Sequence, residues 1–432
     1  TVTLGATSGI SEIVNASTTK HATITDKADN LNFWNLVVPP NTRVTTVSDF
    51  VIKNMIDVQQ NASLIAENGT IYTGKALISD AAVTGRLASN DPVQIKNVSN
   101  HTLTFMNLTM NENTITSDSW NVMGNMVLAD GKSFKADNGT ITFKNYAEKE
   151  IKLTDATSIY EFFGLKIADG SKVTTTNADA TETATIKIKN NKNHQDGAGL
   201  FVEGSGRFYN TKKGDVVIFD TDNMVEAGHP KMIVAEGTDQ LRFGRLELAA
   251  SANNEVQTAS SFVIEGTNAT VDLGSPLTIR GVGASFNATD GTIEFTDNTL
   301  ADPTIASLSP GITTLNNVKA ANDAKINING GDEIFVRGNV IVDDVAIFDA
   351  TLENTKIRMI DGKLQKFTGN SSIVNPVKIS NLTLDKANNS DRVLLETDVE
   401  IIGEADAATS LILNKGILDL GEATLTVGAA GT

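Results

Sequence analysis

The sequence predicts an all-β fold: a right-handed parallel β-helix (β-solenoid) with a distinct N-terminal cap or lead domain. Three observations lead to this prediction, namely composition, an internal repeat and short alternating strands. The chain has 432 residues with 34 Gly, only 8 Pro and 5% aromatic residues, and it is rich in Thr, Asn, Val and Ile. β-Branched residues suit pleated strands, and Asn, Asp and Gly suit the corners between them.

Two eleven-residue segments of the chain share seven of their residues. They are SFKADNGTITF at 133–143 and SFNATDGTIEF at 285–295. A third segment, RFYNTKKGDVVIF, ends at Phe219, so Phe143, Phe219 and Phe295 follow one another at equal spacing. A fixed internal period indicates that the chain stacks one structural unit on another. This period of about 76 residues would hold about three coils if one coil takes roughly 20–25 residues.

Short segments such as GTIEF and NVIVDDVAIF alternate apolar and polar residues, which points every second side chain to one face. Stacking equivalent strands in parallel coils buries that face, and parallel crossovers are almost always right-handed. A string of β-sandwich domains of about 76 residues is the competing architecture. Against it, no linker separates the units and no buried-Trp or tyrosine-corner pattern recurs.

The first 95 residues differ in texture from the rest. They contain Trp34 and the only Pro-Pro pair, and the segment 48–60 predicts a short helix with Ser48 or Asp49 as its N-cap. The predicted organisation is therefore a cap or lead β-rich domain at 1–95, followed at 96–432 by a parallel β-helix built from the super-repeats described above.

Charge and composition exclude several classes of function. The formal net charge is −17 and the chain has no Cys. Nucleic-acid binding needs clustered Lys and Arg, so no nucleic-acid partner is expected. Disulfides, thiolate zinc sites and a cysteine nucleophile are excluded. No apolar run approaches the length that a membrane-spanning helix needs, so no membrane span is expected.

The two ends of the sequence suggest how the chain associates. It begins TVTLGATSGI without a start Met or signal peptide, which indicates a processed form or a piece of a longer polypeptide. Its last segment, GILDLGEATLTVGAAGT, keeps the repeat texture without a cap. Uncovered strand edges offer unpaired backbone groups to a neighbour, so we expect either that the native chain continues past Thr432 or that another subunit lies there. The predicted assembly interface consists of Thr1, Val2, Leu4, Leu418, Leu420, Leu425 and Val427.

Three kinds of segment carry a family resemblance. They are the box F-x-A-x-x-G-T-I-x-F at 134–143 and 286–295, the N-L-T openers at 107–109 and 381–383, and G-x-L-D-L-G-x-x-T-L-T-V at 416–427. This texture resembles the large β-strand-repeat, parallel β-helix proteins of bacterial surfaces, including those of Bacteroidetes and related phyla. The resemblance implies an extracellular or cell-surface location and an adhesin, surface-layer or filament role.

Catalytic chemistry has weak support in the sequence. The four His residues (His21, His101, His194 and His229) show no repeat relationship, and no G-x-S-x-G, H-E-x-x-H or P-loop motif occurs. Carboxylates are more serious catalytic candidates than the His residues, because some parallel β-helices are polysaccharide lyases or hydrolases that use Asp or Glu clusters. The best local clusters are Asp332, Glu333 and Arg337, and Asp343 with Asp344. Acids at strand edges also protect against edge aggregation, so no enzyme is predicted.

Calcium is the only cofactor for which the sequence offers candidates. The corners FDTDN and FTDN place Asp220, Asp222 and Asp297 among carbonyl groups, which suits a hard cation, although Asx-turns explain the same residues. Twelve N-x-S/T sequons occur, and the Asn residues of the N-L-T openers are expected to serve the corners.

The predicted function is that of an extracellular structural protein that assembles with itself, head to tail, into a filament or surface layer. Sheet continuation between subunits is the expected mechanism. One alternative is a monomeric cell-surface adhesin or glycan-binding rod, with residues 1–95 as its functional tip. A less favoured alternative is a β-helix polysaccharide lyase or hydrolase with a groove lined by carboxylates.

Overall fold

A computed structural model shows an all-β chain in which none of the described residues is helical. The chain divides into two compact units, 1–208 and 209–432. The structure describes residues 10–12, 21–24, 31–47, 49–74, 92–98, 103–145, 148–153, 157–177, 185–189, 199–210, 216–220, 231–234, 241–243, 245–248, 255–258, 262–264, 277–279, 285–288, 290–296, 304–307, 313–321, 324–329, 333–343, 346–351, 355–369, 376–403 and 410–428.

The described part of the first unit consists of short strands. They are β1 (Ile10–Glu12), β2 (His21–Ile24), β3 (Leu31–Val38), β4 (Arg43–Thr46), β5 (Phe50–Val58), β6 (Ser63–Ala66), β7 (Thr70–Thr73), β8 (Val93–Asn97), β9 (Thr104–Phe105), β10 (Asn107–Met110), β11 (Thr114–Thr116), β12 (Trp120–Val122), β13 (Met126–Leu128), β14 (Ser133–Ala136), β15 (Thr140–Phe143), β16 (Glu148–Leu153), β17 (Ile159–Phe162), β18 (Gly164–Ile167), β19 (Lys172–Asn177), β20 (Thr185–Lys189), β21 (Gly199–Val202) and β22 (Arg207–Asn210), which contains the boundary.

The second unit has the same texture. Its strands are β23 (Val216–Asp220), β24 (Lys231–Val234), β25 (Leu241–Phe243), β26 (Arg245–Leu248), β27 (Glu255–Thr258), β28 (Phe262–Ile264), β29 (Leu277–Ile279), β30 (Ser285–Ala288), β31 (Thr292–Thr296), β32 (Thr304–Ser307), β33 (Thr313–Leu315), β34 (Asn317–Ala321), β35 (Lys325–Asn329), β36 (Glu333–Val336), β37 (Val340–Val342), β38 (Ile347–Ala350), β39 (Lys356–Ile360), β40 (Leu364–Gly369), β41 (Val377–Ile379), β42 (Asn381–Asp385), β43 (Arg392–Leu395), β44 (Val399–Ile401), β45 (Leu411–Lys415), β46 (Ile417–Asp419) and β47 (Leu425–Val427).

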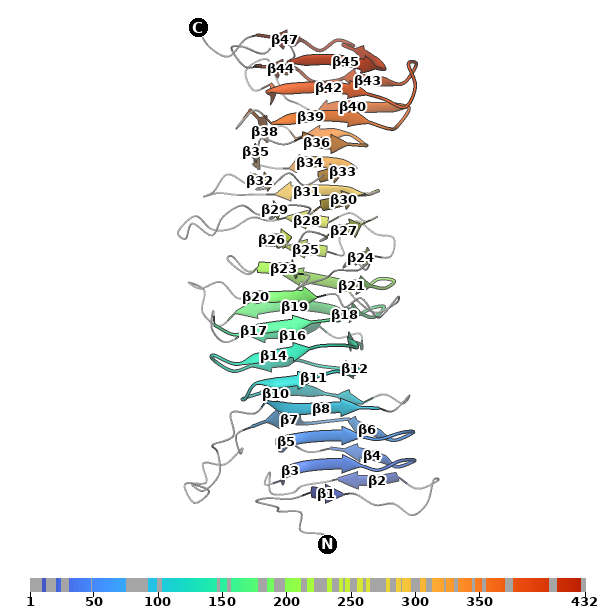
Figure 1. Cartoon of the computed structure of the whole chain (residues 1–432), viewed down its shortest axis with the longest axis vertical. Helices are drawn as coiled ribbons and strands as arrows, with labels where there is room; N and C mark the ends of the chain where they lie inside the picture. Colours follow the sequence, from blue (N-terminus) through green and yellow to red (C-terminus); the bar gives the residue numbers. More distant parts are fainter. Residues whose placement is uncertain are drawn as a thin grey trace. The chain divides into compact units, whose positions relative to one another are not determined.

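In each unit, most strands pair in parallel with the strand three positions further along the chain. In the first unit the ladders include β9–β12–β15–β18–β21, β10–β13–β16–β19 and β11–β14–β17–β20. In the second they include β30–β33–β36–β39–β42–β45, β31–β34–β37–β40–β43–β46 and β32–β35–β38–β41–β44–β47. We call three successive strands a rung. Figure 1 shows the rungs of each unit stacked along the chain.

The prediction of an all-β chain with stacked parallel strands is therefore confirmed for the described residues, and the pairing is consistent with a β-solenoid. Rungs differ in length, because corners absorb extra residues. Leu108 of β10 pairs with Met126 of β13, whereas Phe367 of β40 pairs with Leu395 of β43, which is a much longer step along the sequence. The first step is shorter, and the second longer, than the roughly 20–25 residues expected for one coil.

The helix predicted at 48–60 is wrong, because this segment forms the nine-residue strand β5. Its first half, Phe50–Ile52, pairs with β7, and its second half, Met55–Val58, pairs with β8, so one strand takes the place of two. Apart from the half-buried Met55, the apolar residues of β5 are buried, and this tertiary burial overrides local helix signals. The expected N-cap Asp49 instead accepts a hydrogen bond from the Thr70 amide at 2.6 Å.

The two copies of the eleven-residue box take different places in the rung. The first copy forms β14 and β15, and the second forms β30 and β31. With three strands to a rung, β15 and β30 hold the same place, so the second strand of one box corresponds to the first strand of the other. The two boxes therefore share one kind of corner with its two flanking strands. They do not share a fixed place in the rung.

The interior of the described rungs is mostly apolar, as the alternation predicts. Phe134 of β14 contacts Trp120, Tyr160 and Phe162 with ring centroids 5.5–5.9 Å apart, and all four side chains are at most 1% exposed. Phe143 and Phe295, the box-ending residues, are fully buried. These Phe residues thus form core, and Trp120 offers no exposed aromatic platform.

We expect the substitution Phe134→Ala to lower the free energy of unfolding of the first unit by about 3–5 kcal/mol, because it removes a buried ring and leaves a cavity among three other rings. Denaturant unfolding followed by tryptophan fluorescence measures this loss. The neighbouring substitution Lys135→Ala is the control. Its side chain is 46% exposed, so we expect a change within about 1 kcal/mol. Equal effects of the two substitutions would contradict this account of the core.

Candidate functional site

Large apolar side chains are exposed on the last strands of the second unit. They lie on β45, on β46, directly after β46, and on β47. Their exposed fractions are 54% for Leu413, 42% for Ile417, 42% for Leu420 and 50% for Val427. In Figure 1 these strands lie at the C-terminal end of the second unit, drawn in dark red. Large exposed apolar groups that lie close together mark interaction surfaces more often than isolated ones do.

The register explains why two of these side chains are exposed. Leu413 pairs with Leu384 of β42, and Val427 pairs with Ile401 of β44. Both partners are fully buried. Leu413 and Val427 therefore occupy positions that face the interior. In the preceding rung, the residues at these positions are covered by the rung that follows. The exposure of Leu413 and Val427 results from the lack of a covering rung among the described residues.

The structure partly places the predicted assembly residues in this surface. Leu418 and Leu425 pair with the buried Val393 and Val399 and are themselves half-buried, whereas Leu420 lies exposed just after β46. We call Leu413, Leu418, Leu420, Leu425 and Val427 the edge surface. Sequence reasoning missed Leu413, although alternation along LILNK would have identified it. Thr1, Val2 and Leu4 lie outside the described residues.

The backbone of these strands is also open on one side. Within the described part of the second unit, β45, β46 and β47 each pair with one strand only, namely β42, β43 and β44. The opposite sides of the three strands therefore present N–H and C=O groups that no described strand pairs. Such an edge favours the addition of another strand. The edge surface thus combines apolar side chains with available backbone hydrogen-bonding groups.

The acidic residues weighed for catalysis take part in ion pairs between rungs where the structure describes them. Arg358 of β39 bridges two carboxylates, with Nε 2.6 Å from Oε1 of Glu333 and Nη1 2.9 Å from Oδ2 of Asp385. The hydrogen bond to Glu333 is the main reason that the pKa of Arg358 is raised. Its guanidinium also lies 5.6 Å from the ring centroid of Phe335. Glu333 is therefore held as a structural partner.

A second ion-pair network has the same form. Lys319 of β34 lies between Glu294 of β31, at 3.4 Å, and Asp343, directly after β37, at 3.3 Å. Burial alone would lower the pKa of Lys319, but the two carboxylates outweigh it and raise that pKa. Arg337 lies 3.5 Å from Asp361 in the same way. These contacts join neighbouring rungs along the outer face.

The remaining candidates are not brought together in the described structure. Asp332, Asp344, Asp222 and Asp297 lie outside the described residues, as do His101, His194 and His229, and for Asp220 and His21 only the backbone is described. No group of three or more His, Cys, Asp or Glu side chains suitable for a metal ion is found among the described residues. The calcium candidates therefore stay a prediction.

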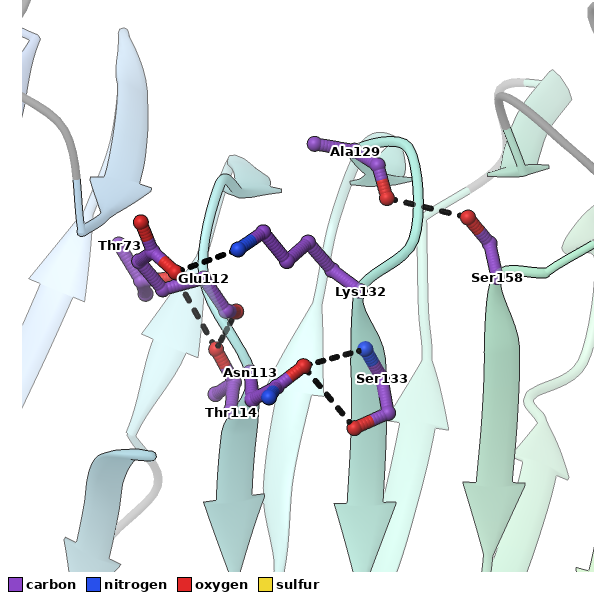
Figure 2. Close-up of polar contacts among 8 residues, drawn as sticks. All are labelled: Thr73, Glu112, Asn113, Thr114, Ala129, Lys132, Ser133 and Ser158. Atoms are coloured by element: carbon purple, nitrogen blue, oxygen red, sulfur yellow. Dashed lines mark hydrogen bonds and ion pairs between the residues drawn. The ribbon is translucent and has the colours of Figure 1, made fainter. Parts of the chain in front are cut away.

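Polar side chains at the corners join one rung to the next. In Figure 2, Oδ1 of Asn113 accepts hydrogen bonds from the amide and the hydroxyl of Ser133, at 2.9 Å and 3.2 Å. The side chain of Glu112 lies 2.7 Å from Nζ of Lys132. Inside the same corner, the fully buried hydroxyls of Thr73 and Thr114 lie 3.0 Å apart. In this corner Asn113 thus satisfies a backbone amide of the next rung.

Asn107, the first residue of the N-L-T opener at 107–109, serves a corner, as the sequence predicts, and Asn317, in an N-V-K segment, takes the same role. Oδ1 of Asn107 accepts the amide hydrogen of Asn125 at 2.8 Å, and Oδ1 of Asn317 accepts that of Asn339 at 2.7 Å. The residues before these two amides are Gly124 and Gly338. A Cβ at either position would come within 2.3 Å of the Oδ1 atom of the corresponding Asn.

Comparison with known proteins identifies no relative: no family model matches the chain, and neither the curated proteins nor the solved structures contain a match. None of the described residues forms a helix long and apolar enough to cross a membrane.

We expect Asn317→Ala to destabilise the second unit by about 1–3 kcal/mol, because it removes the acceptor for the Asn339 amide and a donor to the Gly291 carbonyl. Thermal and denaturant unfolding measure the loss. The control is Asn389→Ala in an exposed turn, where we expect a change within about 0.5 kcal/mol. If Asn317→Ala were as stable as the control, the corner bonds would contribute little.

The buried Lys149 makes the stability of the first unit depend on pH. Its side chain is 1% exposed, and burial lowers its pKa to about 8. Because the unfolded chain keeps the ordinary, higher pKa, it binds more protons than the folded chain above pH 8. Stability should therefore rise by about 1 kcal/mol between pH 7 and pH 9. We expect Lys149→Met to remove this rise, measured by urea unfolding at both pH values, whereas an unchanged slope in the variant would contradict it.

Proposed function

We propose that this chain is a right-handed parallel β-helix that serves as a structural building block outside the cell, associating end to end through the edge surface. The observation that carries the proposal is the exposure of interior-phase side chains on β45–β47, next to unpaired strand edges. The extracellular location rests on the resemblance to bacterial surface proteins. The ion pairs of Glu333 and Asp343 and the burial of Trp120 support a structural role over the enzyme and the glycan-binding rod.

The occupant of the edge surface is a second copy of this chain. A partner must supply parallel strands with the same three-strand spacing, since the free edges of β45, β46 and β47 belong to one rung. It must also present inward-facing apolar side chains that cover Leu413 and Val427. Rungs of this chain meet both requirements, because each one covers the preceding rung in this way. The predicted contribution of Thr1, Val2 and Leu4 to the receiving end belongs to the same proposal.

The energy of association would come from two sources. Full burial of an exposed Leu or Val side chain contributes about 1.5–3 kcal/mol, and the side chains of the edge surface, which are about half exposed or less, would each contribute roughly half of that or less. Backbone hydrogen bonds along three strands would fix the register of the two copies. The net charge of −17 opposes association, so the apolar contact must outweigh a repulsion that salt screens.

We expect the purified chain to form filaments or sheets in negative-stain electron microscopy, and to elute as concentration-dependent oligomers in size-exclusion chromatography with light scattering. The double substitution Leu413→Lys and Val427→Lys should abolish these oligomers, because it places charges on a surface that loses its contact with water when two copies associate. The matched control is Leu364→Lys on β40, which is 51% exposed but not part of the edge surface. It should assemble like the original chain.

Two results would overturn the proposal. One is an original chain that stays monomeric at all concentrations with and without added salt. The other is assembly that persists in the Leu413→Lys and Val427→Lys variant. Isolated rods that bind a glycan would favour the adhesin alternative. Circular dichroism of each variant establishes whether the β fold is retained.

A further inference from the structure

A buried lysine lies against a buried side-chain amide near the end of the second unit. Lys386, directly after β42, is 2% exposed, and its Nζ contacts Oε1 of Gln365 and the carbonyl oxygen of Asp361. Gly416 leaves the space for the lysine stem, since a Cβ there would come within 2.4 Å of Cγ of Lys386. The lysine is therefore enclosed, with its amine directed at the amide.

The amide of Gln365 is fixed in one orientation. Its side chain on β40 is 1% exposed, and Nε2 donates hydrogen bonds to the carbonyl oxygens of Val336 at 2.9 Å and Gly338 at 2.8 Å. These two bonds direct Oε1 toward Lys386. A hydrogen bond from Nζ to Oε1 polarises the amide carbonyl, and the enclosure excludes bulk water from both groups. Amine and carbonyl are thus held together before any reaction.

The surroundings also favour the nucleophilic form of the amine. Burial lowers the pKa of Lys386 to about 8, against the opposing effect of Asp391 and Asp361. A larger fraction of the amine is therefore neutral near neutral pH than for an exposed lysine. Asp391 is 6% exposed, and its Oδ2 accepts a hydrogen bond from the Asn388 amide at 2.8 Å. It is the buried carboxyl whose charge acts on Lys386.

We propose that Lys386 and Gln365 join in an intramolecular isopeptide bond. Nζ of Lys386 attacks Cδ of Gln365, the Nζ–Cδ bond forms and the Cδ–Nε2 bond breaks. Nζ loses one proton in the process, Nε2 gains one, and Asp391 relays it, so that one molecule of ammonia leaves. No oxidant, reductant or added reagent is needed.

The bond would link two successive rungs covalently. Gln365 lies on β40, and Lys386 lies in the corner between β42 and β43, one rung further on. A cross-link of this kind restricts the unfolded chain as a disulfide does, in a sequence that has no Cys. The inference goes beyond the proposed function and does not depend on it, because the cross-link lies within one chain.

Tryptic peptide mapping of the folded original chain tests the proposal. The cross-link joins the peptide 364–366 to the peptide 379–392, which stays uncleaved at Lys386, with a combined mass lower by one ammonia. Tandem mass spectrometry identifies the branch point. Finding instead the free peptides 364–366 and 379–386 at full recovery would overturn the proposal. Succinimide formation at Asn-Gly pairs also releases ammonia, so the branched peptide is decisive rather than the intact mass.

The role of Asp391 is tested with both reacting side chains in place. We expect Asp391→Asn to slow formation of the branched peptide by about 100-fold or more, because it removes the proton relay. The matched control is Asp398→Asn, a carboxylate that accepts the Thr424 amide at 2.7 Å in an exposed corner, and it should cross-link like the original chain. If the Asp391→Asn variant cross-linked at the original rate, Asp391 would not be the relay. Circular dichroism checks that each variant is folded.

Discussion

Parallel register between successive rungs is the constraint on which the rest of each unit depends. Because most strands pair with the strand three positions further along, inward positions fall over inward positions, as in the ladder from Val318 through Val340 and Phe367 to Leu395. A slip by one residue would turn a whole strand inside out. The alternating pattern therefore has to be kept in every strand. The corners, in contrast, vary in length, since the pairing does not depend on how many residues connect two strands.

Corners keep the register by satisfying backbone groups that strand pairing leaves free. An Asn or Asp side chain in one rung accepts the amide hydrogen of the next, as Asp49 does for Thr70, Asn113 for Ser133 and Asp398 for Thr424. This use explains why a chain rich in Asn and acidic residues shows no metal cluster among its described residues. On the outer faces charged side chains also join neighbouring rungs. Lys319 and Arg358 each bridge one acid from the rung before and one acid from the rung after. Polar residues that resemble candidate sites in the sequence are thus employed in stacking.

Much of this fold could be predicted from the sequence, because period-two alternation reports directly on which side chains are buried. The prediction failed at 48–60, where Ser48 or Asp49 followed by apolar residues at mixed spacing resembles a helix start, and only the pairing of β5 with β7 and β8 determines the outcome. The repeated box at 133–143 and 285–295 could be recognised from the sequence. Its place in the rung could not be predicted, because the same motif forms different corners in the two copies. Leu418, Leu420, Leu425 and Val427 were identified from repeat texture. The Lys386 and Gln365 contact joins residues one rung apart, which no local pattern reveals.

A stack in which each rung touches only its neighbours has no distant contacts to hold its last rung in place. In the second unit, β45–β47 are supported on one side by β42–β44, and much of their apolar surface is exposed. Among the described rungs of the second unit, fraying would therefore begin there, and it would next reach the rung that carries Lys386. A covalent link from Lys386 to Gln365 would anchor that rung to the one before it, at the point where stacking alone is weakest. It would leave the edge surface free, because the link lies inside the stack. A rung can cover any similar rung, and this property allows a stack to be extended. For the same reason, a rung that nothing covers is the place where added stabilisation has most effect.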